Sequence, residues 1–119
     1  MNLHAFIQEY TDAVYHGRDA EAAARYIADP CIRHDHGHRV VMSLAENQAR
    51  IRDFLAAASD VRFENATAVA EGELYARAYQ FSFEIDGKRI TRSGIEIFLI
   101  REGKITETWN SAAGEGPWG

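Results

Sequence analysis

Apolar residues recur at helical spacing in the first half of the chain and at alternate positions in the second half. Between residues 3 and 16 they fall three or four positions apart, which predicts an amphipathic helix. Its buried stripe comprises Leu3, Phe6, Ile7, Tyr10 and Val14. Asn2 is expected to cap this helix at its N-terminus, and Gly17 is expected to end it. Asp19 is expected to cap a second, shorter helix that continues to about Ile27.

A proline separates these helices from the next elements. The residue before a proline avoids the helical region, so Asp29–Pro30 is expected to break the helical pattern. Residues 31–35 then form a candidate strand, 36–39 a polar loop and 40–42 another short strand.

The third helix has the clearest signal in the chain. Ser43 and Glu46 form a capping box, in which each side chain binds the backbone N–H of the other residue. The helix is predicted to end near Ala58, with Arg50, Arg52 and Asp53 facing water. Its expected buried stripe is Leu44, Gln48, Ile51, Phe54 and Leu55.

Strands are predicted over the rest of the chain, at 61–69, 74–85, 88–100 and 104–111. Asp86–Gly87 is a strong signal for a two-residue hairpin turn. One face of the second strand carries Tyr75, Tyr79, Phe81, Phe83 and Ile85, and the other carries Ala76, Ala78, Gln80 and Ser82. The order of elements predicts an α+β fold, with helices packed on one side of a curved antiparallel sheet.

Composition narrows the class of protein. The 119 residues, 46% hydrophobic, predict one domain over 1–111 and a loosely held Gly-rich tail over 112–119. A net charge of −5 without a basic run argues against nucleic acid or a membrane surface as partner. The lone Cys31 excludes an intrachain disulfide. With no signal-peptide pattern and no apolar run of about 20 residues, a cytoplasmic location is expected.

The order and length of these elements resemble the nuclear-transport-factor-2-like superfamily, in particular its SnoaL-like polyketide cyclases and ketosteroid isomerases. The resemblance covers residues 3–111. It is carried by the segments FIQEYTDAVYHGRDAEAAARYIADPCIRHD, ENQARIRDFL and GIEIFLIREGKITETWN. It implies a cone-shaped sheet wrapped around the N-terminal helices, with an internal pocket for a small, largely apolar ligand. It also implies acid–base chemistry without a cofactor.

Glu96 is the polar residue that stands out in the last hairpin. It lies in an apolar strand, so its carboxylate must be solvated, paired or used in chemistry. It shares a face with Phe98 and Ile100, and one face of this strand must line the cone. Inside the cone, Glu96 could donate a hydrogen bond or exchange protons with His34; outside, it would pair with Arg77 or Arg92.

The resemblance assigns the other catalytic positions to Tyr10 and to either His34 or Asp35. These two neighbours point to opposite faces of a strand, so only one of them can enter the pocket. A shared face with Ile32 favours His34 as the base, whereas alignment on Ala28–Asp29 favours Asp35.

Phe98, Trp109 and Asn110 are the candidate substrate-binding residues. In the cyclases an acid follows the final tryptophan region, but here that place is occupied by Asn110, which cannot accept a proton and could orient a substrate carbonyl.

His34, His36 and His38 suggest a metal cluster, but the Gly37 turn breaks their alternation, so no metal site is predicted. The small, polar face of strand 74–85 is expected to pair in a homodimer. The alternative to an enzyme is a non-catalytic ligand-binding or dimerisation domain of the same fold.

Overall fold

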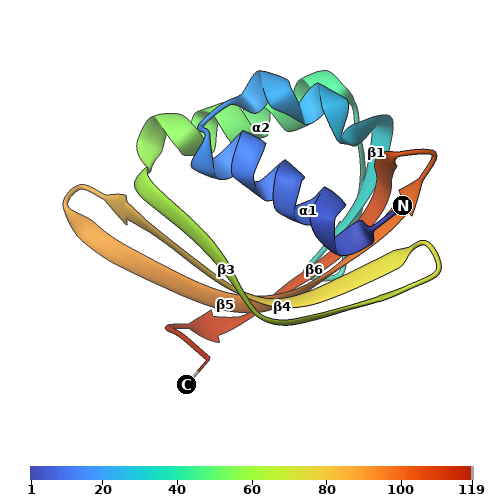
Figure 1. Cartoon of the computed structure of the whole chain (residues 1–119). Helices are drawn as coiled ribbons and strands as arrows, with labels where there is room; N and C mark the ends of the chain where they lie inside the picture. Colours follow the sequence, from blue (N-terminus) through green and yellow to red (C-terminus); the bar gives the residue numbers. More distant parts are fainter. Residues whose placement is uncertain (119) are drawn as a thin grey trace.

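A curved six-stranded sheet holds the helices against its concave side (Figure 1). The strand order is β2-β1-β6-β5-β4-β3. Neighbouring strands are antiparallel except β1 and β6, which are parallel. This computed structural model describes residues 1–118, and Gly119, the last residue of the predicted tail, lies outside the described residues. The α+β class and the one-sided packing of the helices are confirmed.

The elements follow the predicted order. Their bounds are α1 (Leu3–Thr11), η1 (Asp12–His16), η2 (Ala20–Arg25), β1 (Ile27–Asp35), β2 (His38–Met42), α2 (Leu44–Ala57), β3 (Ser59–Glu71), β4 (Leu74–Ile85), β5 (Lys88–Arg101) and β6 (Lys104–Glu115).

Side-chain caps begin the helices where the sequence predicts them. The Asn2 carboxamide accepts from the N–H of Ala5 at 3.0 Å. At α2, Ser43 and Glu46 make both bonds of the capping box, at 3.1 and 2.9 Å. These bonds satisfy backbone donors that the first turn of a helix leaves free.

The N-terminal helix departs from the prediction in its last turn. From Asp12 onward the chain forms a π-helical turn, in which a backbone N–H binds the carbonyl oxygen five residues earlier. The bond from Gly17 N–H to Asp12 O, at 2.7 Å, is of this kind. Because this winding aligns residues five apart, Tyr15 stands beside Tyr10, with ring centroids 6.0 Å apart. A tyrosine outside the predicted stripe thereby reaches the concave side of the sheet.

The strands confirm the predicted alternation, but β1 begins earlier and β6 ends later than predicted. Asp86 and Gly87 both adopt positive φ, 51° and 76°, as a two-residue hairpin turn requires. β1 begins at Ile27 and continues through Asp29–Pro30, because Ile27 pairs with Ile105 of β6. β6 continues to Glu115, so residues 112–115 of the predicted tail belong to the strand.

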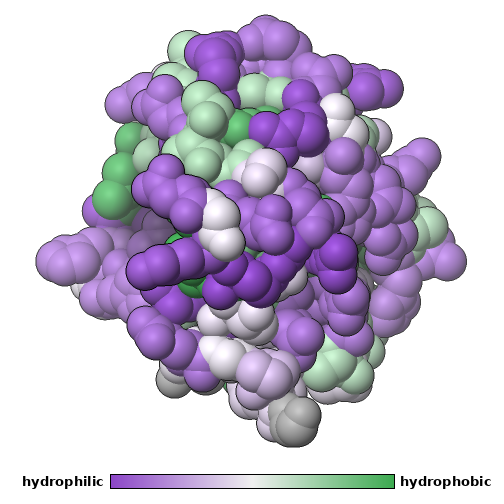
Figure 2. Space-filling view, turned by 90° about the vertical axis from the view of Figure 1, so that its left-hand side faces the viewer, coloured by the Kyte–Doolittle hydropathy of each residue, from purple (hydrophilic) through white to green (hydrophobic). Residues whose placement is uncertain are grey.

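The apolar core lies between the concave face and the helices. It includes Ile7 of α1, Ile51 of α2, Tyr75 of β4, Phe98 of β5 and Ile105 of β6. The face shown in Figure 2 is mainly hydrophilic, with apolar groups visible in a hollow between polar side chains. Within residues 1–118, no helix is both long enough and apolar enough to cross a membrane.

Candidate functional site

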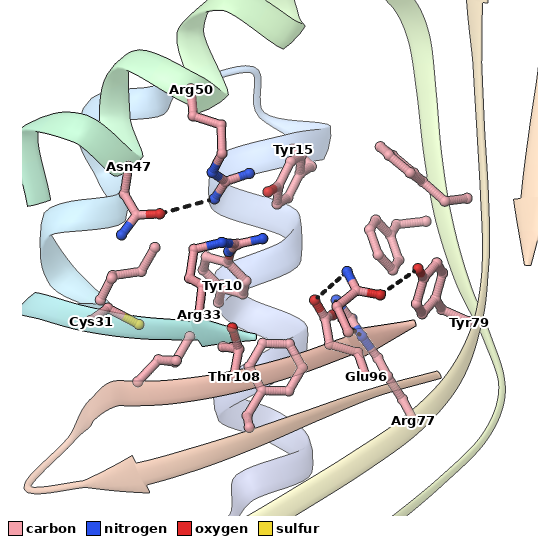
Figure 3. Close-up of a pocket in the computed structure, with 16 residues that line it drawn as sticks. Tyr10, Tyr15, Cys31, Arg33, Asn47, Arg50, Arg77, Tyr79, Glu96 and Thr108 are labelled. Carbon is pink, nitrogen blue, oxygen red and sulfur yellow. Dashed lines mark hydrogen bonds and ion pairs between the residues drawn. The ribbon is translucent and has the colours of Figure 1, made fainter. Parts of the chain in front are cut away.

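A cavity of about 130 Å³ lies between the helices and the concave face of the sheet (Figure 3). The helices contribute Tyr10, Tyr15, Asn47 and Arg50 to its wall. The sheet contributes Ile27, Cys31, Arg33, Phe63, Arg77, Tyr79, Phe81, Glu96, Phe98, Ile105, Thr108 and Asn110. The sequence therefore places a polar cavity inside an apolar core.

Glu96 faces this cavity and is paired there. The whole residue is only 9% exposed. The Oε1 atom accepts from Arg77 Nη2 at 3.0 Å and from Arg77 Nε at 3.3 Å. Arg77 also donates to the Thr11 hydroxyl at 3.0 Å, and its guanidinium lies 4.1 Å from the ring centre of Phe63. The arginine that the sequence offered as a partner outside the cone thus holds Glu96 inside it.

Asn110 extends this pair into a chain of hydrogen bonds. Its Nδ2 donates to Glu96 Oε2 at 3.3 Å, and its Oδ1 accepts from the Tyr79 hydroxyl at 2.9 Å. Burial, followed by the charge of Glu96, raises the pKa of the Tyr79 phenol, so the hydroxyl stays protonated and donates. Within residues 1–118, the long bond from Asn110 is the one hydrogen bond to Glu96 Oε2, which makes this oxygen the one available to a ligand.

Close packing at Gly94 positions the Tyr79 hydroxyl. Gly94 faces Tyr79 across β4 and β5, and a Cβ at Gly94 would lie 2.5 Å from the Tyr79 oxygen. Gly94→Ala is therefore expected to displace Tyr79 from Asn110 and to lower the free energy of unfolding by about 1–3 kcal/mol. Urea denaturation measures this loss.

Gly114→Ala, in β6, is the matched control because a Cβ there meets nothing within 4 Å. Equal stability of the two variants would contradict the assigned packing of Tyr79.

The other side of the cavity is formed by α2, and Figure 3 shows Asn47 and Arg50 extending from this helix toward the sheet. Arg50 Nη2 donates to Asn47 Oδ1 at 3.2 Å. Three buried polar atoms have no hydrogen-bond partner among the described residues: Asn47 Nδ2, Arg50 Nε and Thr108 Oγ1. All three residues line the cavity. The prediction that Arg50 faces water is wrong, because α2 turns its Asn47–Arg50 side toward the cavity.

Three arginines line the cavity, and they differ in their partners. Arg33 pairs with Asp35 at 3.2 Å, and Arg77 pairs with Glu96. Arg50 makes no ion pair within residues 1–118. The cavity therefore carries more positive than negative charge.

Tyr10 lies between these two sides of the cavity in Figure 3. It is 5% exposed. Burial is the largest cause that raises the pKa of its hydroxyl well above the usual value, and Tyr15 adds to the rise. The phenol is therefore a protonated hydrogen-bond donor at neutral pH.

His34 lies on the other side of the sheet. Its Nε2 is 2.6 Å from Glu107 Oε2, and its ring stacks on Trp109 with centroids 5.3 Å apart. These rings line a groove of about 590 Å³ together with Ile95 and Ile97, whereas Glu96 lines the inner cavity. The expectation that His34 and Glu96 share a pocket is wrong. Trp109, which was predicted to bind the substrate there, also lies outside the inner cavity.

The burial of Cys31 explains this error. Cys31 is 2% exposed and faces the cavity, as does Arg33, so Ile32 and His34 point away from it. Asp35 shares the side of Arg33 and bonds to it, but Asp35 does not line the cavity. Of the other predicted residues, Tyr10, Phe98, Glu96 and Asn110 come together in the cavity.

Four residues of the cavity were not predicted from the sequence: Asn47, Arg50, Tyr15 and Thr108. Arg50 and Ile51 follow Asn47 by three and four residues, which places all three on one side of a helix. This spacing to the buried Ile51 could have indicated that Asn47 and Arg50 point inward. Within the described residues, no group of three His, Cys, Asp or Glu side chains is placed to hold a metal ion.

Residues 7–108 match the protein family described as the SnoaL-like domain. Among curated proteins, none matches the chain significantly.

The fold is similar to several solved structures. A protein from Acidithiobacillus ferrooxidans proposed to be a polyketide cyclase has a TM-score of 0.80 and 20% identity, over 92% of this chain and 86% of that one. A SnoaL-like polyketide cyclase from Agrobacterium tumefaciens has a TM-score of 0.77 and 16% identity, over 94% and 91%. A Catenulispora acidiphila protein of ketosteroid isomerase-like fold, in complex with trimethylamine, has a TM-score of 0.73 and 12% identity, over 89% and 83%. At these identities the similarity shows the fold.

Proposed function

We propose, given that the chain belongs to the SnoaL-like domain family, that it is a cofactor-independent enzyme that moves a proton on a small carbonyl compound. The observation that supports this proposal is the meeting of Glu96, Tyr10 and Arg50 in one cavity. A carboxylate, a protonated phenol and a guanidinium are the base, the hydrogen-bond donor and the positive charge that enolisation needs.

The proposed step starts at Glu96. Its Oε2 takes the proton from a carbon next to the substrate carbonyl, and the electrons of that C–H bond form the C=C bond of an enolate. The carbonyl electrons move to oxygen, where the Tyr10 hydroxyl and the charge of Arg50 stabilise the developing anion. If the proton on Glu96 is replaced by one from solvent before it returns to the same carbon, the result is exchange, and delivery of the proton to another carbon gives isomerisation. Asn110 and Arg77 hold the Glu96 carboxylate in place through their hydrogen bonds.

The cavity changes the expected ligand. Ligand pockets for drug-sized molecules usually measure about 300–1,000 Å³, and this cavity measures about 130 Å³. Its three arginines and Asn47 also do not suit the largely apolar ligand that the sequence predicted. The substrate proposed here is therefore smaller and more polar than a steroid or a fused-ring polyketide.

Proton exchange with solvent tests this function directly. Acetone, butanone and pyruvate are incubated with the protein in D2O, and deuterium incorporation next to the carbonyl is followed by NMR. The proposal predicts faster incorporation than in matched buffer for at least one of them. His34→Ala should exchange at the wild-type rate, because His34 lies outside the cavity. No acceleration with any of the three compounds would favour a non-catalytic ligand-binding domain.

We also propose that the outer face of the sheet pairs with a second copy of the chain. Ala76 and Ala78 of β4 point outward, and Ile95 of β5 is 49% exposed beside them. Burying such a face against its own copy would remove apolar surface from water. Light scattering at micromolar concentration should give twice the 13.4 kDa chain mass, and Ile95→Asp should give the monomer. A monomeric wild-type protein would contradict this proposal.

A further inference from the structure

Building on the proposed function, we propose that the substrate is a short-chain oxo acid whose carboxylate binds Arg50, Asn47 and Thr108. Its enolisable carbon would then face Glu96. Three features of the cavity support this assignment: its polar atoms without hydrogen-bond partners, its charge and its size.

Three polar side-chain atoms on the cavity wall have no hydrogen-bond partner among the described residues, two of them on α2 and one on β6. Arg50 Nε and Asn47 Nδ2 are donors, and the Thr108 hydroxyl can donate as well. All three atoms are buried, line the cavity and have no partner within residues 1–118. The orientation of the Asn47 amide is supported by its Oδ1, which accepts from Arg50 Nη2. A buried donor without an acceptor is costly, so this side of the cavity selects a group that only accepts.

Charge narrows that group to an anion. Asp35 and Glu96 bind the guanidinium groups of Arg33 and Arg77, while Arg50 has no carboxylate partner in the described residues. The ligand carries a negative charge only at the end that meets Arg50. A second negative charge at the other end would be repelled by the nearby Glu96 carboxylate. Arginine presents its donors in a planar fork that matches a carboxylate, so a monocarboxylate fits this site.

Size and position define the rest of the ligand. In Figure 3, Arg50 and Asn47 lie at one side of the cavity, Glu96 and Arg77 at the other, and Tyr10 between them. A protein cavity of about 150 Å³ holds benzene, so about 130 Å³ suits a molecule of the size of pyruvate. With the carboxylate at Arg50, the adjacent carbonyl would lie near Tyr10 and the methyl group near Glu96.

The test compares pyruvate with pyruvamide, its neutral isostere, by isothermal titration calorimetry. The wild-type protein is expected to bind pyruvate at least about tenfold more tightly, since hydrogen bonds between charged groups are the stronger kind. Arg50→Gln is expected to remove this preference. Arg52→Gln is the matched control, because Arg52 is on the same helix and pairs with Glu21 at the surface. It should keep the preference.

Thr108→Val provides a second test in case Arg50→Gln fails to fold. It removes a hydroxyl that has no hydrogen-bond partner within residues 1–118 and keeps the shape of the side chain, and it should weaken pyruvate binding about three- to tenfold. Equal affinity for pyruvate and pyruvamide would overturn the inference. An equal loss in the Arg50 and Arg52 variants would also overturn it.

The same samples separate this inference from the proposed function. Tight pyruvate binding without deuteration of pyruvate, acetone or butanone would support the carboxylate site and contradict the proposed enzyme. Deuteration of acetone and butanone by a protein without preference for pyruvate over pyruvamide would support the enzyme and contradict the carboxylate site.

Discussion

Glu96→Gln is expected to lower the rate of deuterium exchange by about 10²–10⁴-fold, which is the usual contribution of a positioned general base. Glutamine fills the same space, and its carbonyl oxygen can still accept from Arg77. It cannot take up a proton from carbon. Exchange rates are measured by NMR at matched protein concentration, with circular dichroism to verify folding.

Two controls make this result specific. Pyruvate should still bind the Glu96→Gln variant, because its proposed carboxylate site is formed by Arg50, Asn47 and Thr108. Asp35→Asn should leave exchange nearly unchanged, since Asp35 bonds to Arg33 and does not line the cavity. Undiminished exchange in the Glu96 variant would exclude Glu96 as the base.

Arg77→Met is expected to lower the free energy of unfolding by about 3–5 kcal/mol, because it leaves the Glu96 carboxylate buried without its ion-pair partner. The double variant Arg77→Met/Glu96→Leu removes both charges, so it should recover much of this loss. Urea denaturation of the wild type, both single variants and the double variant measures the coupling.

Arg101→Met serves as the comparison for this pair. Arg101 pairs with Glu73 at 3.1 Å, but the two side chains are 59% and 56% exposed, so its loss should cost at most about 1 kcal/mol. Similar costs for the Arg77 and Arg101 variants would contradict the burial assigned to the Glu96 pair.

Most of the fold could be predicted because its signals are local. The capping box at Ser43 and the turn at Asp86–Gly87 are set by neighbouring residues, and both appear in the structure as predicted. The start of β1 at Ile27 could not be predicted, since it depends on pairing with Ile105, far away in the sequence. The same is true of β6, whose pairing with β5 extends to Glu115.

The site could be predicted only in part. Glu96 stood out because a carboxylate interrupts an apolar strand, and Phe98 followed from the same face. His34 was assigned to the wrong face, because the larger Ile32 was taken to point inward where the smaller Cys31 does. Arg50 and Asn47 were missed because polar residues that line a polar cavity have the same sequence pattern as residues that face water.

The inner cavity, and not the outer groove of His34 and Trp109, is proposed to bind the substrate. An NMR titration of ¹⁵N-labelled protein with pyruvate tests this proposal, using side-chain N–H signals as reporters. We expect shifts at Arg50 Nε–H and the Asn47 amide, with the Trp109 indole unchanged. Shifts at the Trp109 indole, with Arg50 and Asn47 unchanged, would contradict it.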